Sequence, residues 1–134
     1  MRITIKQNDQ KRTFIVKVQH DYTKPIVKHE QDEFGRDRYT IWRERKTTVR
    51  CHLWNEAEEP NSATVFVGTT VCKYQDNKTY KKSVGRGIAW CHCLGEMNKM
   101  GVFDFEAIKL LSPLTLDATS YEIDVDAGTV AKKN

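Results

Sequence analysis

Residues 63–97 decide the fold and read ATVFVGTTVCKYQDNKTYKKSVGRGIAWCHCLGEM. In the first part, apolar residues recur at every second position through Val71, as in a half-buried strand. From Val84 onward the apolar residues follow helical spacing instead. The stretch therefore predicts a strand, a loop and one main helix over roughly residues 78–99, with Asn77 as the N-cap.

The residues before this stretch predict more strands. Apolar residues alternate with polar ones on both sides of a turn at residues 8–11, which predicts an opening hairpin. A short strand is expected to begin at Ile26 and to be followed by a loop over residues 31–37. Residues 38–54 are expected to form one long strand with a bulge near Arg45 and one basic, solvent-facing side.

The residues after the helix carry weaker patterns. Residues 102–105 are expected to add a strand and residues 107–111 a short helical turn, followed by a peripheral tail. The sequence thus predicts an α+β fold, in which an antiparallel β-sheet or meander is packed by one main helix in the C-terminal half. We expect a single domain over residues 1–134, with strands mostly within residues 1–74 and short elements over residues 101–134.

Composition indicates a soluble globular protein. Of the 134 residues, 39% are hydrophobic and 30% are charged, and no apolar run approaches the roughly 20 residues needed to span a bilayer. The first residues alternate polar and apolar character rather than forming a secretory signal, so we expect a cytoplasmic location and four reduced cysteines. The cysteines lack the paired spacing of structural zinc sites, so we expect neither metal nor cofactor.

Glycine is unusually frequent in the predicted helix. Each of Gly85, Gly87 and Gly95 sacrifices about 1 kcal/mol relative to alanine, which close approach of another backbone would offset. Gly85 and Ala89 share one face, which would press against the sheet, a second subunit or a ligand. With Trp90 on the adjoining face, this surface leads us to expect a homo-oligomer.

Cations gather at the predicted helix start, although a helix N-terminus favours anions. Free backbone N–H groups together with Lys and Arg form a phosphate site, while a solvated basic face is the competing interpretation. With the net charge of +4, this pattern predicts an anionic ligand, a nucleotide, with its phosphates on Arg86, Lys82 and Lys81. Tyr80 or Trp90 would lie near the base.

The same stretch resembles a signature of small bacteriophage proteins. Its matching parts are a strand ending in Gly68-Thr69-Thr70-Val71-Cys72, then Asp76, Lys81-Lys82, and a helix with Val84-Gly85-Arg86-Gly87-Ile88-Ala89-Trp90. The strand–loop–helix layout is similar to that of the first described Thoeris anti-defence family, phage proteins that sequester a cyclic ADP-ribose isomer and so silence a bacterial immune signal.

The resemblance implies a sheet with a packed helix, a homo-oligomer, and nucleotide pockets at subunit interfaces that use aromatic residues and arginines. Arg86 matches the motif directly, and Tyr80 stands near its aromatic position. The loop before Gly85 is about two residues longer than in the signature, and His92 replaces the usual basic residue. The second departure puts a phosphate-binding role for His92 in doubt.

Enzyme motifs are missing from the sequence. It has no Gly-x-Ser-x-Gly elbow, Walker loop or Gly-x-Gly-x-x-Gly turn between a strand and a helix, so we expect a binding protein. A double-stranded nucleic-acid-binding module is one alternative, because its helix starts also place basic residues on phosphates. An inhibitor that binds a host protein through an exposed β-edge and aromatics such as Trp42 and Trp54 is another.

Overall fold

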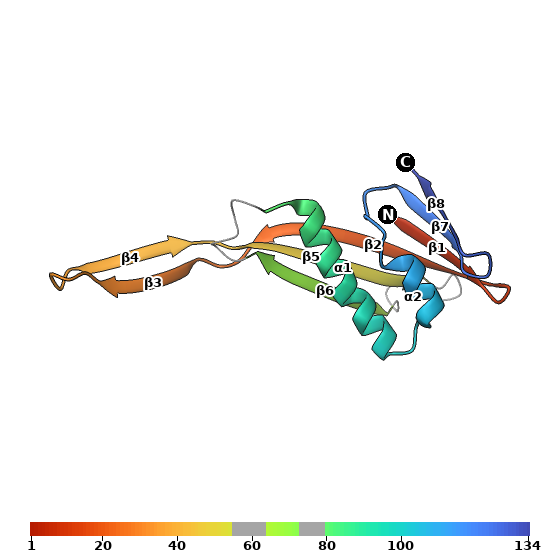
Figure 1. The fold of residues 1–134 in the computed structure, drawn as a ribbon, viewed down its shortest axis with the longest axis horizontal. Helices are drawn as coiled ribbons and strands as arrows, with labels where there is room; N and C mark the ends of the chain where they lie inside the picture. The colour runs from red at the N-terminus through yellow and green to blue at the C-terminus, as the bar shows by residue number, and fades with distance from the viewer. Residues whose placement is uncertain (55–63, 73–79) are drawn as a thin grey trace.

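The computed structural model describes residues 1–54, 64–72 and 80–134. Its elements are β1 (Arg2–Gln7), β2 (Gln10–Tyr22), β3 (Ile26–Gln31), β4 (Asp37–Trp42), β5 (Arg45–Trp54), β6 (Val65–Cys72), α1 (Lys82–Lys99), α2 (Phe105–Leu111), β7 (Ser120–Asp124) and β8 (Thr129–Lys133). The α+β fold class is confirmed: the strands are mostly antiparallel, and the main helix α1, in the C-terminal half, packs on the sheet (Figure 1).

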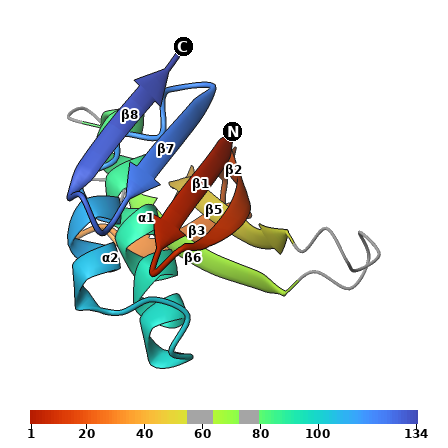
Figure 2. The ribbon, with the colours of Figure 1, turned by 90° about the vertical axis from the view of Figure 1, so that its right-hand side faces the viewer.

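Six strands form one sheet in the order β6-β5-β2-β1-β7-β8, and both helices lie on the same side of it (Figure 2). The order departs from a simple meander because β7 pairs parallel with β1. The opening hairpin is confirmed; Asn8 and Asp9 have positive φ angles, as a two-residue hairpin turn requires. Successive side chains of a strand point to opposite faces of the sheet, and those of Ile3, Phe14 and Cys51 are buried on the face that the helices cover.

The single long strand predicted over residues 38–54 is wrong. β4 pairs only with β3 in a separate two-stranded ribbon, which projects from the end of the main sheet (Figure 1). The chain changes sheets where Thr23 and Glu44 bond each other: the Thr23 N–H donates to the Glu44 carbonyl at 2.8 Å, and the Glu44 N–H donates to Thr23 Oγ1 at 3.0 Å. Periodicity cannot show such a change, because both strands alternate in the same way.

The residues after α1 also differ from expectation. The predicted strand over residues 102–105 is wrong, because Asp104 caps α2 and Phe103 packs against Phe14 with ring centroids 4.9 Å apart. The predicted helical turn over residues 107–111 is confirmed. The tail is not peripheral: Tyr121 and Ile123 on β7 are core residues, because β7 lies beside the central strand β1.

The main helix begins later than predicted. It starts at Lys82 with Lys81 as N-cap, and Asn77, the predicted cap, lies outside the described residues. Gly85 and Ala89 face the sheet and Trp90 is buried, so the surface from which we expected an oligomer is covered within one chain. Glycine allows this close approach: a Cβ on Gly68 would lie 2.0 Å from the Ala89 carbonyl oxygen.

Candidate functional site

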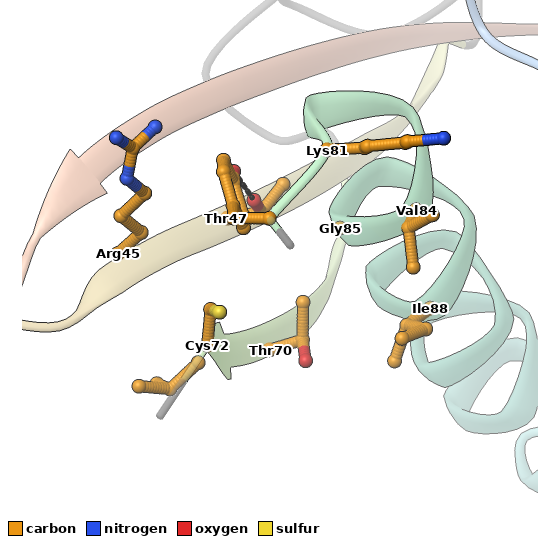
Figure 3. Close-up of a pocket in the computed structure, with 10 residues that line it drawn as sticks. Arg45, Thr47, Thr70, Cys72, Lys81, Val84, Gly85 and Ile88 are labelled. Carbon is orange, nitrogen blue, oxygen red and sulfur yellow. Dashed lines mark hydrogen bonds between the residues drawn. The ribbon is translucent and has the colours of Figure 1, made fainter. Parts of the chain in front are cut away.

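A hollow of about 240 Å³ lies where α1 begins, between the start of β5 and the end of β6 (Figure 3). One wall is apolar and comes from Val84 and Ile88 on α1, and two cations stand at its rim. The described lining residues include no carboxylate; they are Arg45, Thr47, Thr70, Val71, Cys72, Tyr80, Lys81, Val84, Gly85 and Ile88. The arrangement suits a ligand with both an anionic and an apolar part.

Gly85 sets the position of the helix start. A Cβ there would lie 2.6 Å from Thr47 Oγ1, so only glycine lets the first turn of α1 lie directly on β5. Thr47 is buried and its hydroxyl bonds both His20 Nδ1 at 3.1 Å and the Tyr80 hydroxyl at 3.2 Å. The Tyr80 hydroxyl also lies 3.3 Å from His20 Nδ1. This polar cluster fixes the residue that leads into α1.

Arg45 and Tyr80 form the centre of the site. The Arg45 guanidinium carbon lies 4.8 Å from the centre of the Tyr80 ring and 6.0 Å from that of Tyr22, both within cation–π range. A second hollow of about 110 Å³ shares Arg45 and Tyr80 and is also lined by Tyr22, Lys82, His20 and one carboxylate, that of Asp21. Two adjoining hollows therefore share one stacked arginine.

The site is electropositive. Arg45, Lys81, Lys82 and Arg86 make no ion pair within the described part of the chain, and Arg86 Nε is buried without a hydrogen-bond partner there. Burial lowers the pKa of His20 below its ordinary value, and the charges of Lys82 and Arg86 lower it further. No side chain caps the start of α1, and its first turn carries no acidic residue. An anion would relieve this excess of positive charge.

The structure brings together only some of the predicted site residues. Lys81 lines the larger hollow, Lys82 the smaller, and Tyr80 both. Arg86 lies close enough to His20 for its charge to lower the pKa of His20. It does not line either hollow.

Two of the predicted site residues lie elsewhere. Trp90 is 1% exposed and its Nε1–H donates to the Leu111 carbonyl at 2.8 Å, so its assignment to a ligand base is wrong. His92 lies apart from both hollows, with Nδ1 2.7 Å from the Thr69 carbonyl oxygen at the outer edge of β6.

Arg45 is the residue that sequence reasoning missed. The sequence around Arg45 predicted a bulge and gave no indication that Arg45 binds a ligand. Arg45 belongs to the site because of the strands with which β5 pairs. It lies opposite Tyr22 on β2 and opposite Cys72 on β6. These partners are far apart in the sequence, and only the folded sheet brings them to the start of α1.

The four cysteines form no disulfide; Cys51 and Cys93 are buried, whereas Cys91 is exposed. Among the described residues, no group of three metal-ligating side chains could hold an ion. Neither described helix is long and apolar enough to cross a membrane. Comparison with known protein families, curated proteins and solved structures finds no match.

Proposed function

We propose that the larger hollow binds a small phosphate-bearing nucleotide and holds it without chemical change. One observation carries this proposal. Arg45, Lys81 and Tyr80 line a hollow in which no described residue supplies a carboxylate, so its positive charge lacks an internal partner.

Each wall of the hollow has a part in binding. A guanidinium binds phosphate through a planar fork, and stacking on Tyr80 holds that of Arg45 in place before the ligand arrives. Lys81 adds a second charge at the rim, and Val84 and Ile88 offer an apolar surface to a base. Thr47 is buried, so a substrate does not reach its hydroxyl, although His20 lies within hydrogen-bond distance of it; this burial supports binding rather than nucleophilic catalysis.

The resemblance described above names the first ligand to test, a cyclic ADP-ribose isomer. The protein would then act as a phage anti-defence protein that sequesters an immune signal in the host cytoplasm. The hollow of about 240 Å³ is smaller than the roughly 300–1,000 Å³ of a typical ligand pocket. A ligand with two phosphates would therefore extend beyond it, toward the adjoining hollow at Lys82 or toward another chain.

Isothermal titration calorimetry with cyclic ADP-ribose isomers, and with ADP-ribose for comparison, tests the proposal. Removing a charged hydrogen-bond partner costs about 1.5–3 kcal/mol, so Arg45→Ala should weaken binding by about 10- to 150-fold. Lys109→Ala, an exposed change on α2, is the matched control and should bind like the unmodified protein.

Mass spectrometry of the ligand after incubation should recover it unchanged. Binding that survives Arg45→Ala would exclude this hollow as the site. Release of a hydrolysed product would show an enzyme instead.

A second candidate, nucleic-acid binding, is favoured by the sheet face opposite the helices. Lys17 and Arg50 lie directly opposite each other there, a like-charge pair that destabilises a sheet, and neither makes an ion pair within the described residues. A gel shift with duplex DNA or RNA should then show retention at low salt that is lost steeply as salt rises. Absence of retention at low salt would remove this candidate.

A further inference from the structure

The ribbon formed by β3 and β4 carries an exposed apolar row. Val27 pairs with Ile41, and Tyr39 lies two positions before Ile41, so the three side chains share one face of the ribbon. Their exposed fractions are 58%, 67% and 64% in that order. A two-stranded ribbon is at best marginally stable by itself in water. This one projects beyond the main sheet (Figure 1), so a second ribbon running along it would cover the apolar row.

The tip of the ribbon, residues 32–36, is held in one shape. The Asp32 carboxylate accepts hydrogen bonds from the Phe34 N–H, the Arg36 N–H and Arg36 Nε, each at 2.9 Å. Gly35 has a φ of 74°, and the Arg36 guanidinium carbon lies 5.1 Å from the centre of the Phe34 ring. Phe34 is nevertheless 74% exposed. A fixed loop that presents an aromatic side chain loses little conformational entropy on binding, so the tip is preorganised for a partner.

The tip is also acidic. Residues 31–37, QDEFGRD, contain three carboxylates and one arginine, which gives a net charge of −2. The positive charge of Arg36 is paired within the tip, because Asp32 binds it. Glu33 makes no ion pair within the described residues and stands next to Phe34 in the chain. The tip therefore presents an anionic and an apolar side chain together.

The larger hollow is complementary to this tip. Arg45 and Lys81 stand at its rim, Val84 and Ile88 form its apolar wall, and its described lining residues include no carboxylate. The tip of the same chain does not reach it, because the hollow lies where the ribbon joins the main sheet and the tip lies at the far end of the ribbon (Figure 1). The tip that fits this hollow therefore belongs to a second copy of the chain.

We propose that two copies exchange their ribbons, and that the tip of each ribbon docks in the larger hollow of the other copy. Glu33 then faces the two cations of the rim, and Phe34 lies on the apolar wall. A twofold axis across the middle of the ribbons sets them antiparallel, so each tip lies at the base of the other ribbon and both contacts form together. The main sheets and their helices lie at opposite ends of the paired ribbons, which keeps the two α1 helices apart.

The docked tip would regulate the same hollow that we propose for a nucleotide. The Glu33 carboxylate takes the place of a phosphate, so the tip and a nucleotide exclude each other, and the dimer is the form without ligand. Only this competition rests on the proposed function. The exchange of ribbons rests on the charge and shape of the tip and the hollow, and its first test uses the protein without nucleotide.

Sedimentation equilibrium from 1 to about 100 µM measures the association. The unmodified protein should be a dimer in the upper part of this range. Glu33→Lys and Lys81→Glu should each be monomers throughout, because like charges then meet in both contacts and raise the dissociation constant by about 100-fold or more. The double variant should regain association, although only in part because Arg45 is unchanged.

Two controls accompany these variants. Glu96→Lys makes the same charge change as Glu33→Lys in the C-terminal half of α1, where it removes only an exposed ion pair with Lys99, and it should remain a dimer. Circular dichroism should show that every variant is folded; Lys81→Glu is expected to fold because an acidic residue is favourable at a helix start. A monomeric unmodified protein, a dimeric single variant at Glu33 or Lys81, or a double variant that associates no better than these would overturn the proposal.

Addition of a cyclic ADP-ribose isomer to the dimer separates this inference from the proposed function. If the nucleotide occupies the hollow, it should displace both tips and produce monomers. A nucleotide that binds while the dimer persists would overturn docking of the tip in this hollow. A dimer that responds to the charge variants as described but binds no nucleotide would confirm the exchange of ribbons and refute the proposed function.

Discussion

Replacing Gly68 by alanine tests the contact that holds α1 against the sheet. A Cβ at this position would lie 2.0 Å from the Ala89 carbonyl oxygen and 2.5 Å from the Cys93 backbone nitrogen. Both atoms belong to the helix backbone, so no side-chain rotation can relieve the overlap and α1 must move. Gly87, by contrast, has nothing within 4 Å of an added Cβ.

The two substitutions, Gly68→Ala and Gly87→Ala, are expected to change the free energy of unfolding in opposite directions. Overpacking costs about 1–3 kcal/mol, and we expect the upper part of that range because backbone is displaced. Alanine also restricts the unfolded chain, which returns about 0.5–1 kcal/mol, so Gly68→Ala should destabilise the protein by about 2 kcal/mol. Gly87→Ala, in the helix interior, should stabilise it by about 1 kcal/mol.

Thermal and urea unfolding of both variants measure these effects. The melting temperature should fall by about 5–10 °C for Gly68→Ala and rise by a few degrees for Gly87→Ala. Equal stability of Gly68→Ala and the unmodified protein would refute the close packing of α1 on β6. A loss of stability in Gly87→Ala would refute the helical, open environment of that position.

Three further predictions concern the core, the polar cluster and a helix cap. Trp90→Phe removes the bond to the Leu111 carbonyl and should cost about 1–3 kcal/mol in urea unfolding, while nucleotide affinity of the folded variant stays unchanged; reduced affinity would contradict the core position of Trp90. Because the pKa of His20 is lowered, the folded state binds fewer protons than the unfolded state, so its contribution to stability is present above about pH 6.5 and is lost as pH falls below that value. Unfolding at pH 7.5 and 5.5 should therefore show a smaller loss for His20→Gln than for the unmodified protein, and an equal or larger loss would reverse this assignment. Asp104→Ala removes the cap on the Ala107 N–H and should destabilise by about 1 kcal/mol, whereas Asp104→Asn should retain most of the cap; equal effects of the two changes would argue against capping.

Alternation and helical spacing determined much of the fold. The opening hairpin, the strand β6 and most of α1 follow directly from patterns within a few residues, because each element buries one face. Close approach was expected at Gly85, Gly87 and Gly95, and only Gly85 lies where an added Cβ would overlap a neighbour, because Gly87 and Gly95 have nothing within 4 Å. These features are local, so one sequence was enough to indicate them.

Other elements depended on partners far away in the chain. Residues 38–54 alternate continuously, yet β4 and β5 belong to different sheets, because Glu44 bonds Thr23 on another segment. The acidic tail looked peripheral, and only parallel pairing with β1 makes β7 part of the core. Trp90 follows the cations of the helix start by one turn in the sequence, but its side chain lies on the face of α1 that packs in the core.

The candidate site also combines residues that the sequence indicated with residues that only the fold brings together. The sequence by itself determined that cations and an aromatic residue, Lys81, Lys82 and Tyr80, gather at the start of the main helix, because these residues are adjacent in the chain. Only the tertiary structure decided that Arg45 stacks on Tyr80 and that β6 forms an edge of the sheet. Both depend on which strands pair, and that choice is set by packing of the whole sheet beneath α1 rather than by neighbouring residues.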